Sequence, residues 1–249
     1  MYNSWFFNGY SRETNLGIDI SKNKIVSLNT SHDRLVITDI NKNPVRYDIG
    51  VGENLTAVFQ RKKAKRRSGD GNPLIYALKE LNRFTISEAD KTLLYDDMKK
   101  IVKAHYLAQD FDSVVILPSS KPITKWVGKA CSEVLNIPLE EYVFIKATNA
   151  AVLKQLRVVD NDREIVVLRK LLESKKSSGA FNMKDLSQHQ RAFVKPVLIN
   201  PYFNKRFSSI LMVDDLVSSG TTFRASYNAY KSLFSSTKIE CLSLLGPVT

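Results

Sequence analysis

The sequence contains only two cysteines, Cys131 and Cys241, and they lie far apart in the chain. So few thiols exclude a disulfide framework, and no cysteine–histidine cluster has the spacing of metal ligands. No stretch approaches the ~18 consecutive apolar residues of a membrane-spanning helix. The first residues lack the basic and apolar regions of a secretory signal. We therefore expect a cytoplasmic protein without a membrane partner.

Glycine and proline are also sparse, at ten and eight residues of 249, which excludes a low-complexity chain. With 43% apolar and 25% charged residues, the composition is that of a globular protein of one or two domains. Acidic residues are the scarcer charged class: 37 lysines and arginines against 25 aspartates and glutamates give a net charge of +12. Such an excess favours polyanionic partners, whether nucleic acid, phosphorylated metabolites or anionic membrane.

Residues 14–60 contain four short runs of β-branched or alternating residues, separated by polar clusters, and predict a small antiparallel meander. The run from Arg61 to Arg67 has six basic residues in seven, and a loop rich in glycine and polar residues follows it up to Pro73. The sequence thus predicts three parts: a β-rich N-terminal subdomain (1–60), a basic linker (61–72) and a larger domain (73–249).

Helical and strand patterns alternate after residue 73, although residues 160–206 are polar and predict no clear element. This alternation indicates an α/β fold with a parallel sheet flanked by helices. The expected helices cover residues 73–81, 87–106, 122–135, 150–158 and 221–234. The expected strands cover residues 113–117, 142–145, 209–214 and 238–245.

The segment from Ile210 to Thr222 has the composition of a binding loop. An apolar strand ends in Asp214 and Asp215 and continues into small hydroxyl residues and Gly220 before a helix. In parallel α/β sheets, ligands lie at the carboxyl ends of the strands. Backbone N–H groups, hydroxyls and a helix N-terminus suit a phosphate monoester, and a glycine lets the backbone approach it closely. The two carboxylates suit sugar hydroxyls or Mg²⁺.

The segment resembles the signature loop of the type I phosphoribosyltransferases at every position. The resemblance implies a phosphoribosyltransferase-like (Rossmann-like) sheet and transfer of a 5-phosphoribosyl group from phosphoribosyl pyrophosphate to a base-like acceptor, with Mg²⁺ as cofactor and pyrophosphate released. It implies that Asp214 and Asp215 are the catalytic candidates, contacting the ribose hydroxyls and the metal that the substrate carries. The 5′-phosphate would be bound by Ser218, Ser219, Gly220, Thr221 and Thr222. The alternative, a response-regulator-like turn that happens to hold two acids, leaves this phosphate loop unexplained.

A second family element, a pyrophosphate-binding loop, is expected after an earlier strand. The run from Val114 to Leu117 is followed by a Pro-Ser-Ser-Lys-Pro turn. The backbone amides of Ser119 and Ser120 can donate to a diphosphate, and Lys121 can neutralise it. An ordinary strand-to-helix turn is the alternative interpretation.

Motif order is most similar to the ComF-like branch of this family. There too, a basic segment and a Gly-Asp loop precede a helix and a strand with a Pro-Ser turn. This branch suggests an alternative function, a non-catalytic or regulatory protein that binds nucleic acid through its basic surface. The candidate residues for that surface are Arg61, Lys62, Lys63, Lys65, Arg66 and Arg67. The acceptor and the oligomeric state cannot be read from the sequence, and a homodimer is left open.

Overall fold

The structure is a computed structural model of the chain, and its central feature is a seven-stranded, mostly parallel sheet. It describes residues 14–50, 54–62, 72–157, 163–182, 186–187 and 189–248. Along the main path the strands follow the order β3-β5-β12-β11-β7-β8, and β4 also pairs with β5. The five parallel strands are β5 (Asn54–Arg61), β12 (Lys238–Val248), β11 (Ser209–Leu216), β7 (Ser113–Ile116) and β8 (Leu139–Glu140). The predicted α/β fold is therefore confirmed.

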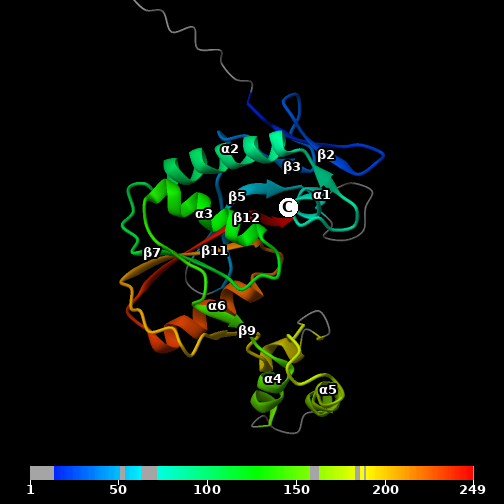
Figure 1. The fold of residues 1–249 in the computed structure, drawn as a ribbon, viewed down its shortest axis with the longest axis vertical. Coiled ribbons are helices and arrows are strands. Elements are labelled where there is room, and N and C mark those ends of the chain that lie inside the picture. Colours follow the sequence, from blue (N-terminus) through cyan, green and yellow to red (C-terminus); the bar gives the residue numbers. More distant parts are fainter. Residues whose placement is uncertain are drawn as a thin grey trace, which may run out of the picture.

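Helices cover both faces of this sheet (Figure 1). The long helix α2 (Glu88–Tyr106) and α3 (Ile123–Leu135) lie on one face, with α1 (Pro73–Leu78) beside them. On the other face lies α6 (Thr221–Leu233). Helix α3 connects the parallel strands β7 and β8, and α6 connects β11 and β12, as parallel pairing requires.

The apolar run in β11 is unbroken because both faces of this strand are covered by helices. Leu211 and Val213 belong to the core cluster beneath α2 and α3, whereas Ile210 and Met212 belong to the cluster beneath α6. All four are fully buried, because alternate side chains of a central strand enter opposite helical layers.

The helix boundaries follow local capping chemistry. At the start of α1, the Asn72 side chain accepts from the Leu74 N–H, and Pro73 occupies the first helical position. Helix α2 begins where Ser87 accepts from the Asp90 N–H. Helix α3 ends at Asn136, which adopts the left-handed conformation that asparagine tolerates (φ 53°). These caps confirm the helix starts that the sequence predicted near residues 73 and 87.

The predicted single meander over residues 14–60 is wrong. Strands β1 (Gly17–Ile20) and β2 (Ile25–Asn29) form an antiparallel hairpin, and β6 (Thr85–Ile86) joins it to make a small mixed sheet. Strands β3 (Val36–Ile37) and β4 (Val45–Asp48) instead pair with β5 in the central sheet. Strand periodicity identifies the strands but not their partners. The division of the chain into domains stays a prediction.

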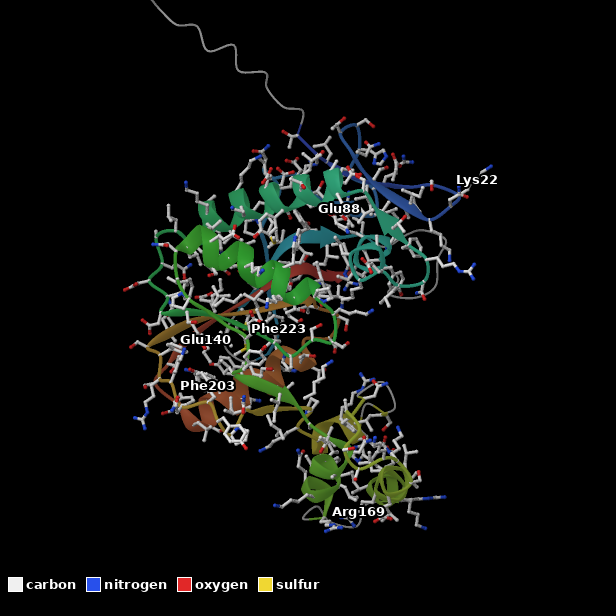
Figure 2. All side chains as sticks on the ribbon, viewed as in Figure 1. Lys22, Glu88, Glu140, Arg169, Phe203 and Phe223 are labelled. Carbon is white, nitrogen blue, oxygen red and sulfur yellow. The ribbon has the colours of Figure 1, made fainter. Side chains whose placement is uncertain are left out.

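The described residues between 144 and 199 form what we call the insertion module. Strands β9 (Phe144–Lys146) and β10 (Val197–Ile199) pair antiparallel at its base, and α4 (Asn149–Leu156) and α5 (Arg163–Glu173) lie beyond them. Apolar side chains of both helices form a separate core cluster. Figure 2 shows the module, with Arg169, apart from the main body that carries Glu140 and Phe223. The sequence had predicted no clear element where α5 occurs.

Among the residues that the structure describes, no helix combines the length and the apolar character that crossing a membrane would require.

Candidate functional site at the carboxyl ends of β7 and β11

The loops that follow β7 and β11 are neighbours at one edge of the sheet. The two strands are parallel and adjacent, with Val213 paired to Ile116. One residue further on, the Leu117 N–H donates to the Val213 carbonyl at 2.9 Å. The two loops that the sequence singled out, 118–122 and 217–220, therefore emerge side by side.

A small pocket of about 50 Å³ forms where β11 ends. Asp214 lines this pocket together with residues 216–223, which include the whole predicted phosphate loop. We call it the loop pocket. Ser218, Ser219 and Thr222 are exposed, and the Ser219 and Thr221 hydroxyls lie 2.9 Å apart. The sequence-predicted carboxylate and hydroxyls thus come together in one cavity.

Gly220 gives the loop its shape. Its φ of 70° lies in the left-handed region, and it forms the N-cap of α6 without a side-chain hydrogen bond to the first turn. The first amide groups of α6 therefore face the pocket as donors, at the positive end of the helix dipole. From the sequence we expected Gly220 to let the backbone approach a phosphate closely. The structure adds a backbone conformation that other residues seldom adopt.

Asp214 is the carboxylate of this pocket. It is half-buried, and one oxygen accepts the N–H of Asp215 at 2.8 Å. Burial, followed by the negative charge of Asp215, raises the pKa of Asp214 to about 8, while Lys79 and Lys146 act in the opposite direction. A carboxylate in this setting gains from any ligand that supplies hydroxyl donors or positive charge.

Asp215 faces the other side of β11 and is only 4% exposed. One carboxylate oxygen pairs with the Lys79 ammonium at 2.7 Å, and the other accepts the Thr124 hydroxyl at 2.9 Å. Lys79 caps α1, and Thr124 lies in the first turn of α3. Asp215 therefore ties both helices to β11, whereas the sequence had treated the two acids as equivalent.

Arg61, predicted to be part of a nucleic-acid surface, is 1% exposed. Its guanidinium donates to the carbonyls of Val217, at 2.6 Å, and Gly246. It therefore holds the start of the phosphate loop against β12, and its assignment to a surface for nucleic acid is wrong. A run of basic residues says nothing about which of them turn inward.

The remaining basic candidates give little further support. Lys62 pairs with Asp33 at 2.8 Å. The other four, Lys63, Lys65, Arg66 and Arg67, lie outside the described residues.

Two residues that the sequence did not single out also support the loop. The Arg224 guanidinium donates to the Ile49 carbonyl at 3.0 Å and approaches the Thr221 hydroxyl at 3.4 Å. Arg224 follows Thr221 by three residues on the helix, so its spacing was a usable signal. Ile49 comes from the N-terminal strands, and nothing in the sequence pointed to it.

The predicted pyrophosphate loop has an accessible surface. Ser119 and Ser120 are exposed, and Lys121 is half-exposed. The Lys121 N–H donates to the Ser119 hydroxyl at 3.2 Å, a local turn that fits either interpretation of the segment. Its role in binding stays a prediction.

The described part of the chain contains no group of three or more His, Cys, Asp or Glu side chains that could hold a metal ion. Asp214 alone offers a carboxylate in the loop pocket, and the oxygens of Asp215 already contact Lys79 and Thr124. These residues fit a Mg²⁺ ion that arrives on a diphosphate rather than one that resides in the protein.

No family model, curated protein or solved structure matches this chain. What the site binds therefore has to be inferred from its own residues.

Proposed function

We propose that the protein binds phosphoribosyl pyrophosphate at this edge of the sheet and transfers the 5-phosphoribosyl group to a base-like acceptor, releasing pyrophosphate. One observation carries the proposal: Asp214 shares a single pocket with the loop from Ser218 to Thr222. A sugar phosphate needs hydrogen-bond donors around its phosphate and hydrogen-bond acceptors near its hydroxyl groups. Both kinds of group line the loop pocket.

The 5′-phosphate would lie in the loop pocket. The backbone amides that open α6 would donate to its oxygens, together with the hydroxyls of Ser219, Thr221 and Thr222. Arg61 donates to the Val217 carbonyl at the start of the loop, and Arg224 joins the Ile49 carbonyl to the Thr221 hydroxyl. The loop is therefore fixed before the ligand arrives, which lowers the entropic cost of binding.

The ribose would lie over the end of β11. Asp214 would accept its hydroxyls, and these hydrogen bonds would favour the ionised form of Asp214. The carboxylate would then stabilise the positive charge that develops on the sugar as the bond to pyrophosphate breaks. Asp215 is better described as a positioning residue, because its contacts are with Lys79 and Thr124. Through the first of these it directs an ammonium group toward the same edge.

The diphosphate would lie over the neighbouring loop, where the amides of Ser119 and Ser120 can donate and Lys121 supplies a positive charge. Mg²⁺, when bound to the diphosphate, would neutralise the charge that builds up on the leaving group. Both cysteines are free and buried, which agrees with the reducing cytoplasm that we propose as the site of this activity.

The nucleic-acid alternative receives no support from the described residues. One of its six candidates is buried and another pairs with an acid. It predicts that no pyrophosphate is released with any acceptor, so release of pyrophosphate separates the two functions.

Calorimetry with phosphoribosyl pyrophosphate and Mg²⁺ tests the proposal. At pH 8.5, where Asp214 is mostly ionised, we expect saturable binding that weakens at least about tenfold in Asp214→Asn, because the amide loses the charge and one acceptor. Asp110→Asn is the matched control, since Asp110 is exposed and precedes β7 at the opposite edge of the sheet. Pyrophosphate release is then measured against a panel of nucleobases. Equal binding by the parent and Asp214→Asn would show that the site is wrongly assigned.

A further inference from the structure

A second, larger cavity of about 710 Å³ runs along α6. Helix α6 forms one wall, and the other is formed by Arg191, Val194, Lys195 and Pro196 of the insertion module. We call it the α6 groove. Ser219 and Thr221 line both this groove and the loop pocket. A ligand whose phosphate lies in the loop pocket can therefore continue directly into the groove.

The groove is long enough for more than one chemical group. On the helical wall it extends from Thr221 through Asn228 to Ser232. At a rise of 1.5 Å per residue, these eleven steps span roughly 16 Å. That length exceeds what a single phosphate or a single base would need.

Positive charge dominates the groove. Arg224 contributes from α6, and Arg191 and Lys195 contribute from the opposite wall. Among the described residues that line it, none is acidic. Arginine and lysine at these positions favour a ligand with a second anionic group next to the first phosphate.

Both walls are held in place by hydrogen bonds. The Lys195 N–H donates to the Gln155 side chain at 2.7 Å, and the Gln155 amide donates back to the Lys195 carbonyl at 3.2 Å. This reciprocal pair attaches the outer wall to α4. On the α6 wall, Arg224 is held in place by its hydrogen bond to the Ile49 carbonyl. The groove is thus a built feature of the fold rather than a gap between loose side chains.

The half of the groove away from the loop pocket has a different character. Ala225 and Ala229 present a small apolar surface on α6, and Pro196 lies on the opposite wall. The exposed amide of Asn228 offers a donor and an acceptor beside them. Flat apolar walls with one amide suit a planar heterocyclic base.

We infer that the α6 groove binds the nucleotide part of a dinucleotide-type ligand, one whose ribose 5-phosphate is joined through a diphosphate bridge to a second nucleoside. The first phosphate would lie in the loop pocket, the second near Arg224, Arg191 and Lys195, and the base between the alanines and Pro196. This inference rests on the proposed function for the position of the first phosphate. It concerns binding and involves no further chemical step.

ADP-ribose is the probe. Phosphoribosyl pyrophosphate is the reference ligand, because it carries nothing beyond the first phosphate on the 5′ side of its ribose. We expect the parent to bind ADP-ribose at least about tenfold more tightly than ribose 5-phosphate, since only the former reaches the groove. Ala229→Phe fills the distal half, and Asn228→Asp places a negative charge there with almost no change in shape. Each should weaken ADP-ribose about tenfold and leave phosphoribosyl pyrophosphate within about twofold. Ala150→Phe, at an exposed position on α4, is the control.

The outcomes separate the two proposals. If phosphoribosyl pyrophosphate binds but ADP-ribose gains nothing over ribose 5-phosphate, the groove inference is overturned and the proposed function stands. A gain that survives both groove variants also overturns it, because the base must then lie elsewhere. If none of the three ligands binds, both proposals fail.

Discussion

The two faces of strand β11 carry one aspartate each, and the protein uses them differently. Asp214 opens into the loop pocket and has no side-chain cation within hydrogen-bonding distance among the described contacts. Asp215 lies on the opposite face, buried against Lys79 and Thr124. Of these two adjacent aspartates, Asp214 therefore faces the candidate site, and Asp215 holds neighbouring helices in place. The comparison shows that strand alternation, rather than residue type, decides the role of a carboxylate here.

The largest effect is expected from Asp215→Ala. The substitution leaves Lys79, whose side chain is only 19% exposed, without its carboxylate and removes the partner of Thr124. We expect a loss of about 3 kcal/mol in the free energy of unfolding, measured by urea denaturation. The double variant Lys79→Met/Asp215→Leu should recover much of this loss. A loss below about 1 kcal/mol would mean that Asp215 is not the scaffold residue of the pair.

Asp214→Asn should have the opposite sign. The raised pKa means that Asp214 is neutral at low pH, and the stability present below its unfolded value near 3.8 is lost as the pH rises through about 8. Asparagine removes this loss. Because the side chain is partly exposed, we expect a gain of only about 2 kcal/mol at pH 8.5, or roughly 4–8 °C in Tm, and almost none at pH 3, below the unfolded pKa. Equal melting of both proteins at pH 8.5 would contradict this expectation.

Gly220→Ala should have the smallest effect and sharpens the comparison at the loop. An alanine there combines a φ of 70° with a Cβ only 3.1 Å from Ile49 Cγ2. Gly50→Ala is a matched control, because Gly50 has a similar φ of 71° and no atom within 4 Å of its Cβ position. We expect about 1.5 kcal/mol for Gly220→Ala and about 1 kcal/mol for Gly50→Ala in urea denaturation. If the two cost the same, contact with Ile49 does not constrain the loop.

Local patterns were enough to predict β7, β11 and β12 of the central sheet and the residues of the loop pocket, whereas β5 and β8 were missed. The apolar run before Asp214 predicted a doubly covered strand, and the residues up to Thr222 predicted a strand–loop–helix unit, which the structure describes as β11, the loop and α6. The helix that the sequence predicted from Ser87 begins with Ser87 as its N-cap. Such features depend on neighbours in the sequence, and that is why they were readable.

The errors and omissions concern partners that lie far away in the chain. Arg61 contacts Gly246 across 185 residues, and Arg224 contacts Ile49 across 175. Residue type gave Arg61 a surface role, because burial of a charged side chain depends on carbonyls contributed by distant segments. Helix α5 was missed for a different reason: Ile165, Leu168 and Leu172 share one buried face, but the polar composition of residues 160–206 obscured this spacing.

Pairing of β5 with β12 has a consequence for how the protein matures. Strands β5 and β12 are neighbours in the folded sheet. Arg61 of β5 donates to the Gly246 carbonyl in β12 and to the Val217 carbonyl just after β11. During synthesis β5 precedes β12 by about 180 residues, so the hydrogen bond from Arg61 to the Gly246 carbonyl cannot form until residue 246 has left the ribosome. We therefore expect full ligand affinity only after β5 and β12 have both been synthesised and have paired.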